Sequence, residues 1–291
     1  MQNLVKMMKV FLHKQINRMF VGAHISKEKT LAKTIDNVKI LGGSALQFFT
    51  SNPRRKEVAD LKKYETEVEI ITEKYKDIAL VVHASYIINV ATPLDNVVES
   101  DIFKIILNDL IIADMLKAVG VVIHVGKSTS DSVESSLVYM EKFIKIVISY
   151  MKEMKMETKL LLETAAGQGT ELLVDIEKFI DFYNLINEPQ YFGLCFDTCH
   201  VWSAGFDITH AFNTIQDKTD QAISVIHLNG SKTKQGSHVD RHESLDTGHI
   251  PLDTIKRFIK NISHDCVIVL ETPDKNKYED EIKLVLNEIK T

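Results

Sequence analysis

The sequence predicts an α/β protein with the (β/α)8 TIM-barrel fold in a single domain, and three observations support this expectation. The chain has 291 residues, and barrels of this kind commonly use roughly 250 residues for one domain. It contains short apolar runs with the residue types of strands. The segments between these runs are mostly long, charged and helix-periodic, as alternating strands and crossover helices require.

The strand-like runs are continuous rather than alternating in hydrophobicity, which is typical of parallel strands buried on both faces. In chain order, they are FVGAHIS from Phe20, ALQFF from Ala45, IALVVHA from Ile78, GVVIHVG from Gly120, KLLLET from Lys159, FGLCFDT from Phe192, ISVIHLNG from Ile223 and CVIVLET from Cys266. The charged segment 131–157 is one of the helices expected between them.

The composition is that of a globular protein. Hydrophobic residues make up 45% and charged residues 26% of the chain, which excludes a disordered protein. Cys195, Cys199 and Cys266 cannot all pair with one another and lack zinc-ribbon or redox spacing. No apolar run reaches the roughly 18 residues of a membrane span. We therefore expect an intracellular protein in a reducing compartment, with no membrane partner.

Residues 1–19 form a basic extension that we separate from the barrel domain of residues 20–291. The extension contains no acidic residue, and apolar residues recur at helical spacing at Val5, Met8, Leu12 and Ile16. This pattern favours an additional helix packed on the fold. Mitochondrial targeting is a weaker alternative, because such segments normally contain Ser and more Arg. A disordered arm or one that contacts nucleic acid is a third.

Residues of metal-ligand type stand at the ends of several predicted strands. They are His83, His124, Glu163, Asp197, His227 and Glu271. A barrel exposes the carboxyl ends of its strands at one rim, so these side chains should converge on one cavity. Without cations, so many carboxylates and imidazoles would repel and desolvate one another. Mixed His and carboxylate sets suit Zn²⁺, Mn²⁺ or Fe²⁺. We expect more than one metal ion and hydrolytic chemistry.

The stretch FGLCFDTCHVWSAGFD, residues 192–207, extends this pattern. Its apolar run ends at Asp197, and His200 follows in the first turn beyond the strand, within reach of the same cavity. We interpret Cys195 and Cys199, which flank Asp197, as small buried residues rather than thiolate ligands.

Several long motifs resemble those of the endonuclease IV family, the trinuclear-zinc apurinic/apyrimidinic (AP) endonucleases. The resemblance runs from VGAHIS at Val21 to VLETP at Val269, and includes VHASYIIN, IHVGKS, LLETAAGQGT and HLNGSKTKQGSHVDRHESLDTGHI. It implies a zinc-dependent hydrolase of base excision repair, which cleaves the phosphodiester 5′ to an abasic site to give a 3′-OH and a 5′-deoxyribose phosphate. It also implies removal of blocked 3′ ends. The implied partner is double-stranded DNA carrying these lesions, and we expect a monomer.

The resemblance implies three Zn²⁺ ions per chain, with Mn²⁺ as a partial substitute. The ligands of the three ions would be, in turn, His83, His124 and Glu163; Glu163, Asp197, His227 and Glu271; and His200, Asp240 and His242. Glu163 would bridge the first two ions. We expect Glu163 and Glu271 to serve in catalysis as well as in metal binding.

Arg54 in TSNPRRK and Tyr86 in HASYIIN match DNA-handling residues of the family. In the family such side chains enter the duplex and hold open the space left by a flipped-out abasic nucleotide. The neighbouring Arg55 leaves open which arginine inserts. The simpler alternatives are a solvated loop charge for Arg54 and rim packing for Tyr86. His24 matches a family position outside the ligand set, and we expect it to orient a ligand or a phosphate.

Two other functions are compatible with parts of this pattern. Sugar isomerases also place carboxylate and His ligands on a barrel rim. They need fewer metal ions, however, which would leave Asp240 and His242 without a function. A protein that binds damaged DNA without cleaving it is the second alternative, but it would not need the complete set of ligand types.

Overall fold

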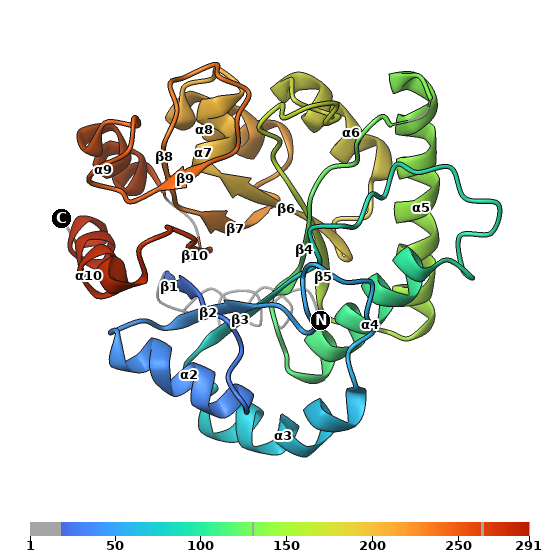
Figure 1. The fold of residues 1–291 in the computed structure, drawn as a ribbon, viewed down its shortest axis with the longest axis horizontal. Helices are drawn as coiled ribbons and strands as arrows, with labels where there is room; N and C mark the ends of the chain where they lie inside the picture. Colours follow the sequence, from blue (N-terminus) through green and yellow to red (C-terminus); the bar gives the residue numbers. More distant parts are fainter. Residues whose placement is uncertain (1–18, 130, 263–264, 291) are drawn as a thin grey trace, which may run out of the picture.

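Parallel strands close into a barrel that helices surround (Figure 1). The computed structural model describes residues 19–129, 131–262 and 265–290. The barrel strands are β1 Phe20–His24, β2 Ala45–Phe48, β3 Ala79–His83, β4 Gly120–Ile123, β5 Lys159–Glu163, β6 Phe192–Asp197, β7 Ile223–His227 and β10 Val267–Leu270. Their order around the barrel is β1-β10-β7-β6-β5-β4-β3-β2. The predicted TIM barrel is confirmed, and every predicted run contains a strand.

The strands are apolar throughout because alternate residues face two separate cores. Val81 on β3 and Leu161 on β5 pack inside the barrel, whereas their neighbours Val82 and Leu162 pack outward against the helices. This alternation has a period of two residues. Side chains two positions beyond the inner core residues therefore point into the mouth of the barrel.

Helices cover the outside of the barrel. The long ones are α2 Leu31–Ile40, α3 Leu61–Lys74, α4 Asp101–Met115, α5 Val133–Glu153, α6 Ile176–Ile186, α8 Ile208–Lys218, α9 Leu252–Asn261 and α10 Tyr278–Ile289. Several begin at Ser, Thr or Asp caps; Ser100 and Ser132, for example, accept hydrogen bonds from first-turn backbone amides of α4 and α5. None of the helices in the described ranges has the length and apolar character needed to cross a membrane.

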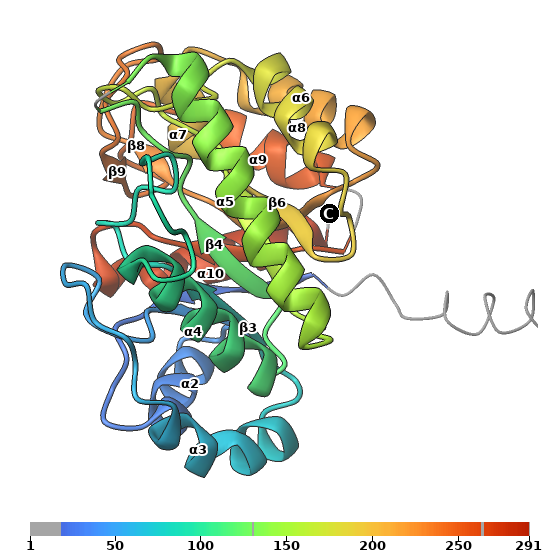
Figure 2. The ribbon, with the colours of Figure 1, turned by 90° about the vertical axis from the view of Figure 1, so that its right-hand side faces the viewer.

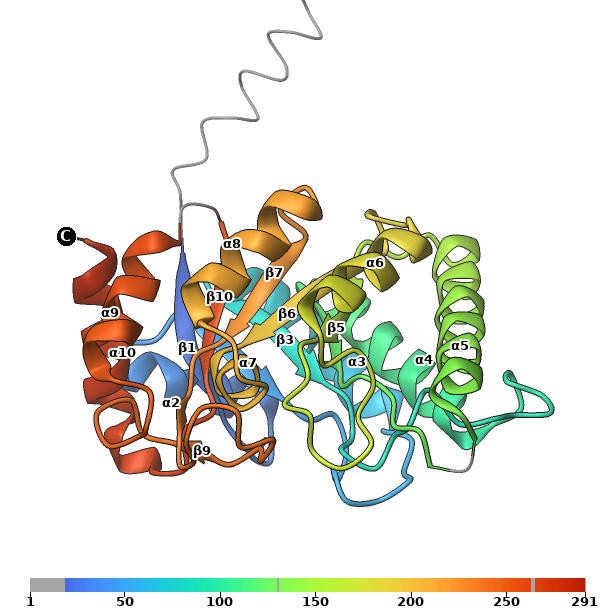
Figure 3. The same ribbon diagram turned by 90° about the horizontal axis from the view of Figure 1, so that it is seen from above.

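The loops that follow the strands gather at one end of the barrel (Figures 2 and 3). This end also holds a small antiparallel hairpin of β8 Gly230–Ser231 and β9 His242–Glu243, the short helix α7 Thr198–Ser203 and the 3-10 turn η1 Lys275–Lys277. The first turn of α7 follows β6 directly, so His200 lies close to the strand end, as expected.

The basic extension of residues 1–19 lies outside the described part of the chain, apart from Met19. The additional helix expected there therefore remains a prediction. In the closed sheet β1 pairs in register with β10 from Phe20 onward, and the division of the chain into residues 1–19 and 20–291 stays a prediction.

Candidate metal centre

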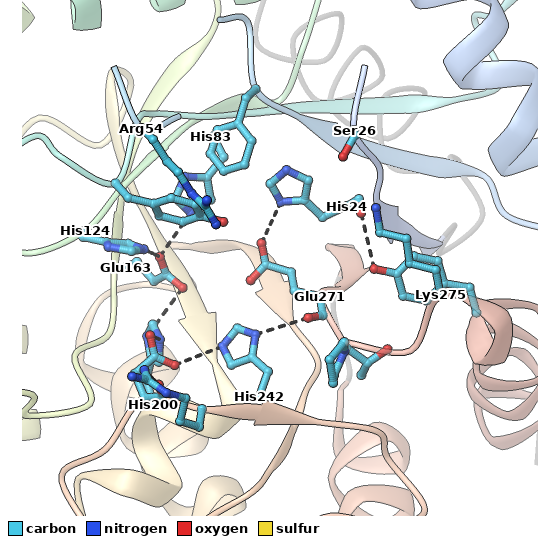
Figure 4. Close-up of a pocket in the computed structure, with 17 residues that line it drawn as sticks. His24, Ser26, Arg54, His83, His124, Glu163, His200, His242, Glu271 and Lys275 are labelled. Carbon is cyan, nitrogen blue, oxygen red and sulfur yellow. Dashed lines mark hydrogen bonds and ion pairs between the residues drawn. The ribbon is translucent and has the colours of Figure 1, made fainter. Parts of the chain in front are cut away.

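The mouth of the barrel holds a cavity of about 730 Å³ lined by ligand-type side chains (Figure 4). Strand alternation explains how they arrive there, because His83 and Glu163 lie two residues beyond the inner core residues Val81 and Leu161. The wall of the cavity includes His83, His124, Glu163, His200, Asp240, His242 and Glu271. The other predicted ligands, Asp197 and His227, are fully buried.

Glu163 lies at the centre of the predicted first and second sites. Its Oε1 lies 2.8 Å from His227 Nδ1, and its Oε2 lies 3.1 Å from His124 Nε2 and 3.6 Å from His83 Nε2. Burial by itself would raise the pKa of Glu163, but the positive charge available on His227, His124 and His200 outweighs it and holds the pKa well below its usual range. Glu163 is therefore an ionised, buried carboxylate.

The predicted second site surrounds His227. Its Nδ1 faces oxygens of three carboxylates, at 2.8 Å from Glu163 Oε1, 3.3 Å from Glu271 Oε2 and 3.8 Å from Asp197 Oδ2. One ligand atom from each of these four residues lies within 4.8 Å of all the others. Three carboxylates packed around one imidazole form an arrangement that needs a positive charge.

The predicted third site joins α7 to the β8–β9 loop. Asp240 Oδ2 lies 3.3 Å from His200 Nε2, and Asp240 Oδ1 lies 3.3 Å from His242 Nε2. His242 Nε2 also lies 3.6 Å from Asp197 Oδ2. Burial lowers the pKa of His242, but Asp197, Glu271 and Asp240 outweigh this effect and raise it to about 9. Without a metal ion, the imidazoles must therefore hold protons to balance the carboxylates.

Backbone carbonyls orient two of the histidines. His83 Nδ1 lies 2.8 Å from the carbonyl oxygen of Ala84, and His200 Nδ1 lies 2.8 Å from that of Thr164. A carbonyl only accepts, so each Nδ1 is the protonated nitrogen. The Nε2 atoms are left facing the carboxylates, as ligand histidines of a metal site require.

The residues present fit bound zinc. Glu163 Oε2 and His242 Nε2 are buried and have no hydrogen-bond partner among the described residues, and the close His124 contact of Glu163 Oε2 lacks hydrogen-bond alignment. Unpaired ligand atoms of this kind are costly unless a cation binds them. The set of histidine nitrogens and carboxylate oxygens suits zinc. Ligand atoms of His83, Glu163 and His227 lie within 4.8 Å of one another, so His227 is also close to the predicted first site.

Cys199 is the other potential ligand in this region, because its Sγ lies within 4.8 Å of ligand atoms of Asp197 and His242. Burial raises the pKa of Cys199 to about 12, and that of Cys195 likewise to about 12. Both thiols are therefore neutral in the metal-free protein. The complete burial of both residues agrees with their interpretation as small buried residues, and both are free of disulfides.

Arg54 and Tyr86 lie at the rim of the same cavity. Arg54 lines it, whereas Arg55 turns away to an exposed ion pair with Glu57 at 3.2 Å. Tyr86 is 53% exposed, and its ring packs edge-on against Phe49 with a centroid distance of 4.9 Å. The tyrosine ring thus packs against Phe49 while about half of the residue remains exposed to solvent.

Sequence reasoning missed several residues that hold the predicted ligands. Asn229 donates to Asp197 Oδ2 at 2.7 Å and accepts from the Glu271 amide at 2.9 Å. Gln47, inside β2, contacts both His227 and Glu271. The only signal in the sequence was one polar residue inside the apolar run ALQFF. His24, expected to orient a ligand or phosphate, places Nδ1 2.8 Å from Glu271 Oε1 (Figure 4).

Comparisons with known proteins place this barrel in a family. The xylose isomerase-like TIM barrel family matches residues 35–289. A probable endonuclease 4 of Pediococcus pentosaceus is 31% identical over 271 residues, 88% of each chain. Another, from Halothermothrix orenii, is 30% identical over 280 residues, 92% of this chain and 98% of the relative.

Solved structures agree in fold. Endonuclease IV from Thermus thermophilus has a TM-score of 0.72 at 24% identity, covering 93% of this chain and 99% of that one. A D-tagatose 3-epimerase-like protein reaches a TM-score of 0.75 at 17% identity, covering 94% of this chain and 97% of its own. These structural similarities show the fold alone, whereas the sequence identity to the relatives shows common ancestry. The chain therefore belongs to the endonuclease IV family of nucleases, within the xylose isomerase-like TIM barrels.

Proposed function

We propose that this protein is a zinc-dependent AP endonuclease of base excision repair that acts as a monomer on double-stranded DNA. It hydrolyses the phosphodiester 5′ to an abasic site, leaving a 3′-OH and a 5′-deoxyribose phosphate, and it also removes blocked 3′ ends. The observation that supports the proposal best is the convergence of the predicted ligands at the mouth of the barrel, where most of them line one cavity with Arg54 and Tyr86 at its rim. The names of the relatives, probable endonuclease 4, support it.

The ligand residues would hold three zinc ions. Glu163 is placed to serve two of them, because its two oxygens face different histidines, His227 on one side and His124 on the other. Bound zinc would supply charge neutralisation for the phosphodiester and activation of water for attack on phosphorus. Burial of Glu163 and Asp197 keeps the ligand carboxylates out of bulk water, where their charges would be screened.

The rim residues would position the DNA. Tyr86 offers an exposed aromatic face on which a base can stack, and Phe49 supports that ring from the protein side. Arg54 offers a planar cation at the cavity wall. Together these side chains would fill the space that the abasic nucleotide leaves when it turns into the cavity. The ion pair of Arg55 with Glu57 supports Arg54 as the inserted arginine.

The sugar isomerase alternative has less support. The likeness to an epimerase-like protein concerns the fold alone. A sugar site with fewer metal ions would also leave Asp240 and His242 without a role, although they lie 3.3 Å apart and beside His200.

The direct test is incubation of the zinc-loaded protein with a duplex that contains one abasic site. We expect a single nick 5′ to the lesion and a 3′ end that a DNA polymerase can extend. The Glu163→Gln variant, which keeps the size of the side chain, serves as the control for contaminating nucleases. An intact duplex, or conversion of an aldose to a ketose by the same preparation, would overturn the proposal.

A further inference from the structure

One buried amide connects two of the predicted ligands. Gln47 faces the interior of the barrel from β2 and is completely buried. It pairs in register with His24 on β1, so both side chains lie at the same level of the barrel. A primary amide in such a position must find partners for its oxygen and for its nitrogen.

The partners of Gln47 determine which way its amide points. Gln47 Oε1 lies 2.8 Å from His227 Nε2, and Gln47 Nε2 lies 2.7 Å from Glu271 Oε1. If the amide were turned over, its oxygen would face the Glu271 carboxylate and the two acceptors would repel. The carboxylate oxygen can only accept, so the amide nitrogen must face Glu271 and the amide oxygen must accept from His227.

This orientation selects one tautomer of His227. Because Nε2 donates its proton to Gln47, the lone pair of the neutral ring is on Nδ1. Nδ1 is the atom that faces Glu163 Oε1, Glu271 Oε2 and Asp197 Oδ2. The amide therefore directs the metal-binding nitrogen toward the three carboxylates of the second site.

The same amide also gives the two carboxylate oxygens of Glu271 different surroundings. Glu271 Oε1 accepts from Gln47 Nε2 at 2.7 Å, and His24 Nδ1 lies 2.8 Å from the same oxygen and 3.0 Å from Gln47 Nε2. The other oxygen, Oε2, is the one that faces His227 Nδ1 at 3.3 Å. Oε1 is thus occupied by the Gln47 amide, and Oε2 is left for a metal ion.

We infer that Gln47 is a positioning residue for the second zinc site, which holds the His227 tautomer and the Glu271 carboxylate at the same time. The inference rests on the proposed three-zinc centre and adds a residue outside its ligands. Hydrogen-bond partners of metal ligands typically change metal affinity by about 10- to 100-fold when removed. Gln47 contacts two ligands of one site, so its loss should weaken that site selectively.

The test replaces Gln47 by Met, whose side chain has a similar length but donates no hydrogen bond and accepts one only weakly. Zn²⁺ binding by the metal-stripped and reloaded variant is measured by chelator competition, with zinc counted per chain. Phe48→Leu is the matched control, because Phe48 is the next residue on β2 and packs in the outer core, away from the ligands. We expect one of three zinc ions to bind about 10- to 100-fold more weakly in Gln47→Met, and unchanged binding in Phe48→Leu.

A second measurement is made on the natural protein, and a variant is needed only to assign the signal of His227. Histidine ¹⁵N spectra of the zinc-loaded natural protein, assigned with the His227→Asn variant, should show Nε2 protonated and Nδ1 metal-bound. Zinc on His227 Nε2, or equal loss of zinc in Gln47→Met and Phe48→Leu, would overturn the inference. If the natural protein bound no zinc at all, the proposed function itself would fail, which is a different outcome.

Discussion

The Glu163 carboxylate and the His227 imidazole lie 2.8 Å apart between Oε1 and Nδ1, although β5 and β7 carry them and β6 separates these strands. Glu163 Oε1 also lies 3.5 Å from His200 Nδ1. The opposite oxygen of Glu163 faces His124 and His83. A single buried carboxylate is therefore surrounded by imidazoles from four different segments of the chain, which is the position that a bridging metal ligand would occupy.

Replacement of Glu163 by Gln should damage the protein more than replacement of a ligand that serves one ion. The amide cannot bridge two cations, so we expect zinc to be lost from two sites. Cleavage of abasic DNA should fall by more than the roughly 10- to 100-fold typical of changes around metal ligands. Zinc content and nicking rate are measured together, with Glu177→Gln, a solvent-exposed change on α6, as the control. Full activity in Glu163→Gln would refute its role.

Replacement of Tyr86 by Ala should weaken binding to abasic DNA without changing zinc content. The exposed ring supplies one stacking surface, and such a stack contributes roughly 1 to 3 kcal/mol to binding. Equilibrium binding by fluorescence anisotropy measures the effect, and Tyr139→Ala on α5 provides a control away from the rim. If Tyr86→Ala lost zinc as well, the ring would be a packing element for His83 and His124, whose rings it contacts.

Asp109 should make the protein less stable as the pH rises. It lies buried on α4, and burial raises its pKa to about 7 although Thr50 donates a hydrogen bond to it. In the unfolded chain the Asp109 carboxyl ionises near pH 4. Between pH 4 and 7 it is therefore protonated in the folded protein and ionised in the unfolded one, so the free energy of unfolding should fall by up to about 1.4 kcal/mol per pH unit. The contribution of Asp109 to stability is complete below about pH 4 and is lost above about pH 7.

The Asp109→Asn variant isolates this effect, because it keeps the acceptor for Thr50 and removes the titration. Urea unfolding of both zinc-loaded proteins at pH 5, 6 and 7 is the measurement. Acid release of zinc affects both proteins and cancels in the difference. We expect the natural protein to lose stability relative to the variant as pH rises, and a constant difference would show that Asp109 is ionised in the folded state.

The charge of the barrel mouth should depend on zinc. The chain has a formal net charge of −5, which is unusual for a DNA-binding protein, and three zinc ions would bring it to about +1. The metal-free mouth should repel phosphate and the loaded mouth should attract it. We expect zinc removal to abolish binding to an undamaged duplex as well, and binding by the loaded protein to weaken with salt.

Anisotropy with an intact duplex, with and without zinc, measures this effect once circular dichroism has shown that the metal-free protein is folded. Equal affinities would mean that the basic rim residues alone capture DNA. Those on rim loops are Arg54, Arg55, Lys127, Lys232, Lys234 and Arg241.

The sequence was sufficient for the barrel and for the residues at its strand ends. Continuous apolar runs such as that ending at His83 identify parallel strands, and barrel geometry then brings their ends together. Gln47 and Asn229 were missed because their partners are distant in the sequence. His227 lies 180 residues from Gln47, and Asp197 lies 32 residues from Asn229. A single polar residue in an apolar run forms no repeating pattern from which its partner could be predicted.

The structure gives Arg54 and Arg55 different surroundings, and which of them inserts into DNA stays a prediction. The two arginines are adjacent in one loop, and sequence pattern treats them alike. Ser85 anchors this loop, because its hydroxyl donates a hydrogen bond to the carbonyl oxygen of Pro53 at 2.7 Å. In this loop Arg54 lines the cavity, whereas Arg55 pairs with Glu57.

The most direct test of the central claim is a zinc titration of the metal-stripped protein, in which nicking of an abasic-site duplex and zinc bound per chain are measured in the same samples. The proposed centre uses ligands from all three predicted sites, so activity should appear only as occupancy approaches three zinc ions per chain. A fully active protein that holds one zinc ion per chain would contradict the three-zinc centre.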